Sequence, residues 1–364
     1  MQIGIVGLPN VGKSTLFNAL TKKGVLAANY PFATIDPSVG IVPVPDERLE
    51  KLSKFSDSKK TIPAVIEFVD IAGLVEGASK GEGLGNKFLT HIREVDAILQ
   101  MVRIFPLEEN GNGIMHVYGN IDPLRDMKVI NMELILADLE SVDKRIGNIS
   151  RDAKRGEKAA VAEDAVLQKV KRVLEEEKMA NTLVLEEAEA KILKSMNLLT
   201  AKKIIFGLNK KTGVKNLDAT DPAKFAELTK TIADAGYEYV VIDAKTEDDI
   251  RDMTVEEKAE LREGDADGIN ELITKSYKLL GLQTFLTTGP EESRAWTIKI
   301  GSCAPQAGAA IHTDFLTKFI RAQVINWQDL LDSGSMANAR AKGLLRTEGK
   351  EYVVKDGDVI EFMV

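Results

Sequence analysis

Residues 7–14 have the types and spacing of a phosphate-binding loop. They read Gly-Leu-Pro-Asn-Val-Gly-Lys-Ser and fill every fixed position of the pattern G-x-x-x-x-G-K-[ST]. The two glycines permit a tight turn whose N–H groups point at phosphate oxygens, the lysine can reach the β- and γ-phosphates, and the serine hydroxyl can bind Mg²⁺. An apolar segment at 2–6 predicts a strand before the loop and residues 15–21 predict a helix after it, which is the context that the motif requires. The binding residues expected for a nucleoside triphosphate are therefore Asn10, Val11, Gly12, Lys13, Ser14 and Thr15.

Two later segments supply groups that such a site needs for the metal and the γ-phosphate. Asp70-Ile71-Ala72-Gly73 follows the apolar segment 64–69 and matches D-x-x-G. We expect Asp70 to hold Mg²⁺, together with Ser14, and Gly73 to offer its N–H to the γ-phosphate. Thr34 lies in a loop between two prolines and is the candidate that closes over the metal, with a plain surface threonine as the alternative.

Leu74 occupies the position directly after D-x-x-G, where Ras-like GTPases carry a glutamine that orients the attacking water. A leucine side chain neither donates nor accepts a hydrogen bond. Hydrolysis is therefore either slow or assisted by another group, and a leucine that simply packs inward fits both cases. The glycines that follow, at 77, 81, 83 and 85, predict a switch loop that orders when nucleotide binds.

The base-binding segment is altered relative to GTPases. The apolar segment 203–208 leads into Asn209-Lys210-Lys211-Thr212, where GTPases place N-K-x-D and the acid pairs with guanine. Asn209 and Lys210 are retained, but Thr212 cannot form the charge-assisted pair, so we expect ATP to be preferred and GTP also bound. After the strand expected at 239–242, Ala244 is expected to offer its N–H to the base, while Asp243 departs from the usual Ser-Ala-Lys pattern.

Composition limits the class of protein. The 364 residues suffice for two to three domains, and 44% hydrophobic with 29% charged residues is ordinary for a globular protein. A net charge of −8 argues against a general nucleic-acid coat protein without excluding a local RNA contact. Three histidines and one cysteine make a structural zinc site improbable. Because Met1 leads directly into the first strand, no apolar run reaches membrane-spanning length and Cys303 stands alone, we expect a cytoplasmic protein.

Residues 131–199 interrupt the α/β pattern. Apolar residues recur at threes and fours between charged ones, which predicts amphipathic helices packed as an antiparallel coiled coil with a turn at Gly156. The basic residues near that turn could contact RNA, or they form an ordinary solvated helix end. They are Arg151, Lys154, Arg155 and Lys158.

Several of these segments together resemble the YchF/Obg-like ATPase family, a branch of the translation-factor-class phosphate-loop NTPases. The resemblance rests on residues 7–14, Asn-Tyr-Pro-Phe-Ala-Thr at 29–34, Asp-Ile-Ala-Gly-Leu-Val at 70–75 and Gly-Leu-Gly-Asn-Lys-Phe-Leu at 83–89, and it runs over nearly the whole chain. It implies a doubly wound α/β nucleotide-binding domain (1–130 and 200–281), a helical coiled-coil insertion (131–199) and a C-terminal mixed-β TGS domain (282–364). It also makes His116 the candidate that positions water in place of the missing glutamine. The alternative is a surface histidine in a flexible loop.

The function that follows as an expectation is slow, Mg²⁺-dependent hydrolysis of ATP by a ribosome-associated regulatory ATPase. Lys13, Gly73 and His116 are the expected catalytic residues, and Leu74 explains the slow rate. The alternatives are a GTP-specific GTPase of the Obg class and a nucleotide-gated ribosome- or RNA-binding factor with little hydrolysis. A small-molecule phosphotransferase is disfavoured because it would lack D-x-x-G. The expected partner is the ribosome or ribosomal RNA, with neither membrane nor DNA, and the chain is expected to be monomeric.

Overall fold

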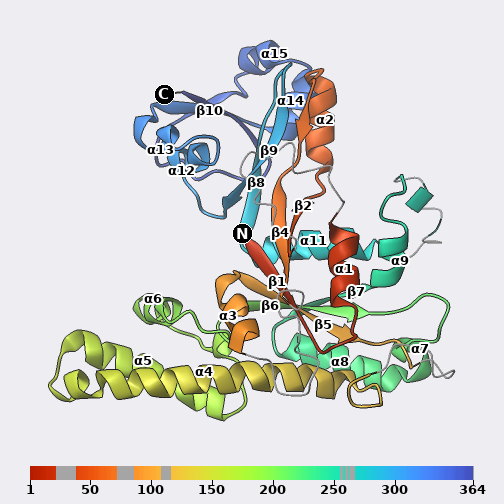
Figure 1. Cartoon of the computed structure of the whole chain (residues 1–364). Helices are drawn as coiled ribbons and strands as arrows, with labels where there is room; N and C mark the ends of the chain where they lie inside the picture. Colours follow the sequence, from red (N-terminus) through yellow and green to blue (C-terminus); the bar gives the residue numbers. More distant parts are fainter. Residues whose placement is uncertain are drawn as a thin grey trace. The chain divides into compact units, whose positions relative to one another are not determined.

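The computed structural model describes residues 1–21, 38–71, 86–107, 116–254, 257–258, 261 and 267–363, with only the backbone of residues 86 and 87. Thr34, Gly73, Leu74 and the glycines between 77 and 85 lie outside the described residues. Within the described part the chain divides into two compact units, one formed by residues 1–21, 38–40 and 67–272, the other by 41–66 and 273–363 (Figure 1).

A six-stranded sheet of order β2-β4-β1-β5-β6-β7 organises the nucleotide-binding part of the chain. Its strands are β1 (Gln2–Val6), β2 (Val39–Pro43), β4 (Val65–Asp70), β5 (Ala97–Arg103), β6 (Lys203–Asn209) and β7 (Glu238–Ile242). β1 pairs in parallel with β4 and β5, and β5, β6 and β7 continue the parallel ladder. β5 is buried along its whole length, as expected for a parallel strand covered on both faces. This confirms the predicted doubly wound α/β fold, and it places the loops that follow β1, β4, β5 and β6 at one edge of the sheet.

Short helices connect or follow these strands. They are α1 (Lys13–Leu20), α3 (Asn86–Glu94), α7 (Leu217–Thr220), α8 (Pro222–Asp234), α9 (Ala244–Asp249) and α11 (Gly268–Leu279). Asp221 caps α8 by accepting from the N–H of Lys224 at 3.0 Å, with a proline at the first helical position. α1 packs against α9, which brings the phosphate loop next to the segment that follows β7.

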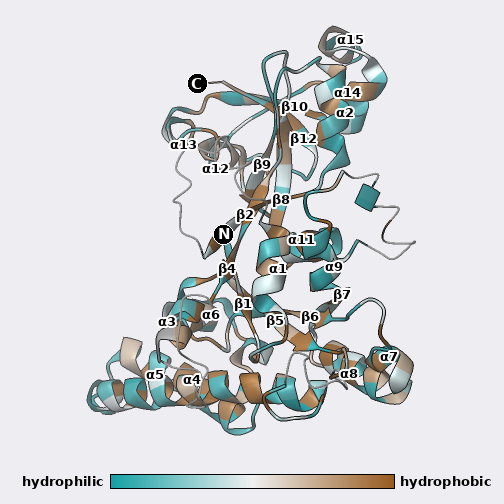
Figure 2. Cartoon of the chain, turned by 45° about the vertical axis from the view of Figure 1, so that its right-hand side comes forward, coloured by the Kyte–Doolittle hydropathy of each residue, from teal (hydrophilic) through white to brown (hydrophobic). Residues whose placement is uncertain are grey.

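The predicted helical insertion is present, but its first helix begins earlier than expected. α4 (Pro123–Lys154) and α5 (Lys158–Glu175) lie along one another, and a 3-10 turn (Ala180–Thr182) and α6 (Glu187–Ser195) follow (Figure 1). Asp122 caps α4 ahead of a proline, so the helix starts before the boundary expected at 131. Figure 2 shows hydrophilic and hydrophobic residues alternating along α4 and α5, and Gly156, with φ 81°, makes the turn between them, as predicted.

The second unit is built on another six-stranded sheet, of order β11-β10-β12-β8-β9-β3. Its strands are β3 (Thr61–Ile62), β8 (Leu282–Thr287), β9 (Ser293–Lys299), β10 (Arg321–Asn326), β11 (Arg346–Glu348) and β12 (Asp358–Met363). Its helices are α2 (Glu47–Phe55), α12 (Ala304–Ala309), α13 (Asp314–Lys318), α14 (Trp327–Ser333) and α15 (Met336–Ala341). The pairings of β8 with β9 and of β10 with β12 are antiparallel and that of β12 with β8 is parallel, so the expected mixed-β character is present.

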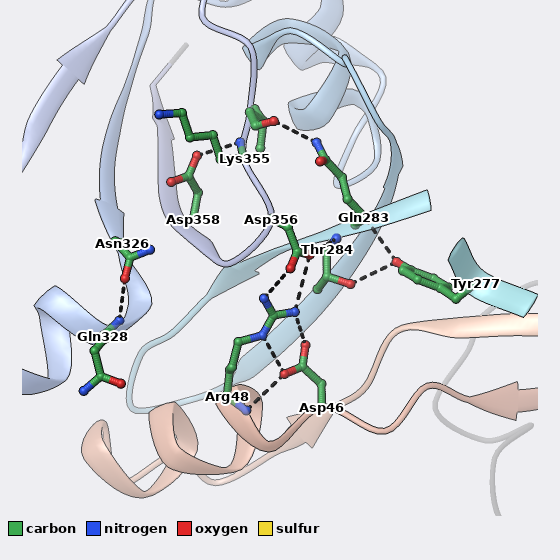
Figure 3. A network of polar contacts seen from close by, with 11 residues as sticks. Asp46, Arg48, Tyr277, Gln283, Thr284, Asn326, Gln328, Lys355, Asp356 and Asp358 are labelled. Atoms are coloured by element: carbon green, nitrogen blue, oxygen red, sulfur yellow. Dashed lines mark hydrogen bonds and ion pairs between the residues drawn. The ribbon is translucent and has the colours of Figure 1, made fainter. Parts of the chain in front are cut away.

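The segment 41–66 joins this C-terminal sheet, which the sequence analysis did not anticipate. β3 pairs in parallel with β9, and Arg48 at the start of α2 lies between the carboxylates of Asp46 and Asp356 (Figure 3). Asp356 also accepts from the N–H of Thr284 on β8, at 2.9 Å. The compact units thus divide the chain differently from the expected boundaries at 131, 200 and 282, and those boundaries stay a prediction.

Candidate functional site

The loop between β1 and α1 has the backbone that its glycines were expected to allow. Gly12 has a φ of 99° and Asn10 a φ of 64°, both in the left-handed region. Gly12 caps α1 without a side-chain hydrogen bond. A Cβ on Gly12 would collide with the amide nitrogen of Asn209. The loop can therefore turn its N–H groups inward only with glycine at position 12.

Lys13 brings a positive charge into this loop with little solvent around it. Its side chain is buried, and Nζ donates to the carbonyl oxygen of Leu8 at 2.8 Å. Burial lowers the pKa of Lys13 from 10.5 to about 8, against the opposing attraction of the Asp70 carboxylate. A cation that is desolvated to this extent gains most from a second, stronger anion, and a triphosphate is such an anion.

A cavity of about 430 Å³ opens beside this lysine. Its walls come from the phosphate loop, the end of β5, the segment after β6 and the start of α9. The lining residues are Asn10, Gly12, Lys13, Ser14, Thr15, Arg103, Phe105, Asn209, Lys210, Lys211, Ala244 and Lys245. Most of the predicted nucleotide-binding residues are thus brought together. Val11 is buried behind the loop, and Thr212 is exposed and absent from this lining.

Asn209 links the base-binding segment to the phosphate loop. Its Nδ2 donates to the carbonyl of Val11 at 2.8 Å, and its Oδ1 accepts from the N–H of Ala244 at 3.0 Å. The N–H of Ala244 therefore has an acceptor within the protein, and the expectation that it meets the base stays a prediction. Lys210 is held in the same way, because its N–H donates to the carbonyl of Ile242 at 2.8 Å.

Two lining residues, Arg103 and Phe105, were missed by the sequence analysis. Arg103 ends the otherwise uncharged strand β5 and is 1% exposed. Its Nη2 donates to the carbonyl of Pro106 at 2.9 Å, and its guanidinium carbon lies 3.9 Å from the centroid of the Phe105 ring. The sequence contained a signal for Arg103, because it is a charged residue at the carboxyl end of a buried strand. Ligands of parallel sheets bind at that edge.

The donors expected for Mg²⁺ fit that ion as far as they are described. Ser14 lines the cavity, and Asp70, which is 5% exposed at the end of β4, lies opposite Ile5 in the parallel ladder beside β1. The described residues contain no cluster of three or more histidine, cysteine or acidic side chains arranged for a metal. One hydroxyl, one carboxylate and substrate phosphates suit Mg²⁺, which keeps several waters and takes few protein ligands.

His116 lies in a buried polar pair. Its side chain is fully buried, Nε2 donates to the Asp126 carboxylate at 2.8 Å, and Nδ1 accepts from the N–H of Tyr118 at 3.2 Å. Arg125 completes the arrangement by donating to the same carboxylate at 2.9 Å. The alternative of a surface histidine is wrong, and the ring uses both nitrogens inside the protein. Among the described lining residues of the cavity His116 does not occur.

Comparisons with known proteins agree with this architecture. A family model described as a 50S ribosome-binding GTPase matches residues 2–137. A YchF-GTPase C-terminal model, described as a protein of unknown function, matches residues 282–364.

Curated relatives match over the full length. The chain is 50% identical to "Ribosome-binding ATPase YchF" of Bacillus subtilis (strain 168), and the alignment covers 100% of this chain and 98% of that protein. It is 47% identical to the protein of the same name from Escherichia coli O157:H7, again over 100% and 98%.

Among solved structures, that of the Schizosaccharomyces pombe YchF GTPase matches with a TM-score of 0.89 at 37% identity, covering 100% of this chain and 97% of that one. A GTP binding protein from Pyrococcus horikoshii OT3 matches with a TM-score of 0.61 at 20% identity, which supports the fold alone.

Proposed function

The chain belongs to the YchF family, and from this membership and the geometry of the phosphate loop we propose that it is a ribosome-associated ATPase that hydrolyses ATP slowly to ADP and phosphate. The observation that carries the proposal is the buried Nζ of Lys13 in a glycine-shaped loop at the wall of a 430 Å³ cavity.

Different groups of the protein bind the phosphates, hold the metal and stabilise the developing charge. The amides of residues 10–14 and the positive end of α1 bind the phosphates. Lys13 leaves the carbonyl of Leu8 for the β- and γ-phosphate oxygens and stabilises the charge that develops there. Ser14, Asp70 and Thr34 would hold Mg²⁺, which would supply positive charge to neutralise the phosphates. Gly73 offers its N–H to the γ-phosphate.

Slow turnover has two supports. Leu74 cannot orient water, and His116, the group that replaces the glutamine in this proposal, is engaged with Asp126 and Tyr118. To reach a γ-phosphate the imidazole must break both hydrogen bonds. A hydrogen bond to a charged partner is worth about 1.5–3 kcal/mol, so only a minor fraction of molecules holds the histidine free at any moment.

The preference for ATP rests on Thr212. Without a carboxylate at this position guanine loses its charge-assisted partner, while Asn209, Lys210 and the apolar part of the cavity wall serve either purine. GTP is thus a weaker second substrate. Tight binding of GTP with little affinity for ATP would favour the GTP-specific alternative of the Obg class.

The partner we propose is the ribosome, because the relatives carry ribosome binding in their names. The exposed basic residues Arg151, Lys154, Arg155 and Lys158 at the α4–α5 turn are one contact for ribosomal RNA, and the C-terminal domain, residues 282–364, is a TGS module and a second contact. The protein then acts in the cytoplasm, as a monomer. No described helix is both long and apolar enough to cross a bilayer.

Phosphate release from ATP tests the enzymatic part of the proposal. Wild-type protein should release phosphate slowly with Mg²⁺, not with excess chelator, and faster with ribosomes added. Lys13→Met should abolish release in every condition. Ribosome pelleting with ATP, ADP or no nucleotide tests the association separately, and a nucleotide-dependent association without any phosphate release would favour the nucleotide-gated binding factor instead.

A further inference from the structure

Asp243 is the acidic residue that departs from the Ser-Ala-Lys pattern, and the structure gives it two partners. Its Oδ2 accepts from the N–H of Thr212 at 2.6 Å, and its Oδ1 accepts from the N–H of Thr246 at 2.9 Å. The side chain is 8% exposed and is absent from the described lining of the cavity. One carboxylate therefore joins the base-binding segment to the first turn of α9 from behind the cavity wall.

The rest of this segment is pinned on both sides of Thr212. Before it, the N–H of Lys210 donates to the carbonyl of Ile242, and the side chain of Asn209 forms the two hydrogen bonds described above. Lys211 and Asn216 form two hydrogen bonds with one another, of 2.9 and 3.1 Å. Thr212 itself is exposed, and its N–H donates to the Asp243 carboxylate. The carboxylate is thus the contact that fixes the main chain at the position where GTPases keep their guanine-reading acid.

From this arrangement, and resting on the proposed nucleotide site, we propose that Asp243 is the positioning residue of the base-binding loop and that the acid present at 212 in GTPases has been exchanged for an acid at 243. The loop keeps its shape, but the described lining of the cavity holds no carboxylate that could face the base. The cavity therefore accepts a purine without requiring the amino group of guanine, which suits adenosine triphosphate.

The exchange also explains why Thr212 is not acidic. The main-chain N–H of residue 212 donates to the Asp243 carboxylate. An acidic side chain at 212 would therefore place a second carboxylate on a residue that is already in contact with the first. Asp243 has little exposure although Thr212 is exposed, and two carboxylates on these neighbouring positions repel one another. An acid at one of the two positions therefore disfavours an acid at the other.

Titrations with three probes test the role of Asp243 in the full-length protein. Asp243→Ser keeps a side-chain oxygen that can cap α9 but is too short to reach Thr212, and Asp243→Asn, a smaller perturbation, keeps the shape but loses one of the two acceptors. We expect Asp243→Ser to weaken ATP and GTP binding about tenfold and Asp243→Asn to weaken both about threefold. Both variants should leave the binding of inorganic tripolyphosphate, which has no base, within twofold of wild type. Asp248→Asn, on the same helix and paired with Arg251, is the control and should change none of the three.

The outcomes distinguish a failure of the role proposed for Asp243 from a failure of the proposed ATPase function. An equal loss of tripolyphosphate binding would mean that Asp243 only supports the fold, and unchanged ATP binding would mean that it does not order the loop; either result overturns the inference. Wild-type protein that binds neither ATP nor tripolyphosphate would overturn the proposed function and the inference with it.

A second pair of variants tests the exchange itself. Thr212→Glu combined with Asp243→Ser returns the acid to position 212, and we expect the ratio of GTP to ATP affinity to rise at least tenfold. Thr212→Glu alone should raise that ratio far less, because Asp243 remains. Equal ratios in the single and double variants would show that the two positions are independent and would contradict the exchange.

Discussion

At the scale of single residues, Lys13 links nucleotide binding to pH. Its pKa is lowered to about 8 in the free protein by burial, so below pH 8 the group is already charged, and above it a proton must be taken up when a triphosphate binds. The dissociation constant for ATP should therefore rise between pH 8 and 9, by up to tenfold per unit. Calorimetry in two buffers of different ionisation enthalpy should detect proton uptake at pH 9 and little at pH 7; no uptake at pH 9 would contradict the lowered pKa.

The lowered pKa of Lys13 also affects the stability of the free protein, with a pH dependence opposite to that of ATP binding. Because the pKa of Lys13 is lower in the folded state than its ordinary 10.5, the charged form is disfavoured by folding. The contribution of this group to stability is least favourable below pH 8 and improves as the pH rises from 8 towards 10.5. Tight nucleotide binding and maximal stability of this loop therefore occur at different pH.

Asp126 controls how often His116 is available. Asp126→Asn keeps an oxygen for Nε2 but removes the negative charge, which weakens the hydrogen bond by about 1 kcal/mol. If His116 positions water, the rate of ATP hydrolysis by the isolated protein should rise about fivefold in this variant and fall in His116→Ala. An Asp126→Asn rate at or below wild type, with unchanged melting temperature, would show that the pair is not a restraint on the catalytic group.

At the scale of elements, Arg48 stabilises the start of α2 through Asp46 and also contacts Asp356 of the same compact unit. Its Nε and Nη2 donate to the two Asp46 oxygens at 2.8 and 2.7 Å, and Nη1 donates to Asp356 at 2.6 Å (Figure 3). The hydrogen bonds with Asp46 raise the pKa of Arg48 although burial opposes the shift. The arginine is 23% exposed and Asp356 is 53% exposed, so most of the stabilisation comes from the two-point pair with Asp46.

Chemical denaturation of the Arg48→Met variant measures how much the contacts of Arg48 stabilise the protein. We expect a loss of about 2 kcal/mol in the free energy of unfolding. The matched control is Lys59→Met on the same segment, whose ion pair with Glu291 is exposed (69% and 79%) and whose loss should cost less than about 0.5 kcal/mol. Similar losses in the two variants would show that Arg48 adds nothing beyond a surface ion pair.

The pairing of β3 with β9 has a practical consequence for experiments on the C-terminal domain. Deleting residues 282–364 removes the strands on which segment 41–66 packs, so a truncated chain exposes α2 and β3 as well. Point variants are therefore the better way to assign ribosome contacts.

At the scale of the whole molecule, the basic residues of the α4–α5 turn belong to an acidic chain. Arg151→Gln with Lys154→Gln should weaken ribosome association several-fold at low salt and flatten its salt dependence, because fewer counterions are released from RNA. Lys191→Gln with Lys194→Gln on α6 removes the same charge and should have little effect. A comparable loss in the two double variants would mean that only net charge matters.

The sequence was most informative where function depends on contiguous residues. The phosphate loop and its strand and helix are local, so their pattern predicted the fold around Gly12 and Lys13. The pairing of β3 with β9, the engagement of His116 with Asp126 and the entry of Arg103 into the cavity depend on which segments meet in three dimensions. A two-residue strand has no periodicity to detect, and Asp126 lies before residue 131, where the helical insertion was expected to begin. The hydrogen bond from the Ala244 N–H to Asn209 was not predicted for the same reason, because the two residues are 35 positions apart in the chain.

The central claim is that the loop at residues 7–14 binds a triphosphate through its amides and Lys13. A crystal structure with Mg²⁺ and a non-hydrolysable ATP analogue tests it most directly. The account predicts the β- and γ-phosphates against the N–H groups of residues 10–14, Nζ of Lys13 moved from Leu8 to those oxygens, and the base beside Asn209 and Lys210. A bound analogue elsewhere, with Lys13 still donating to Leu8, would contradict it.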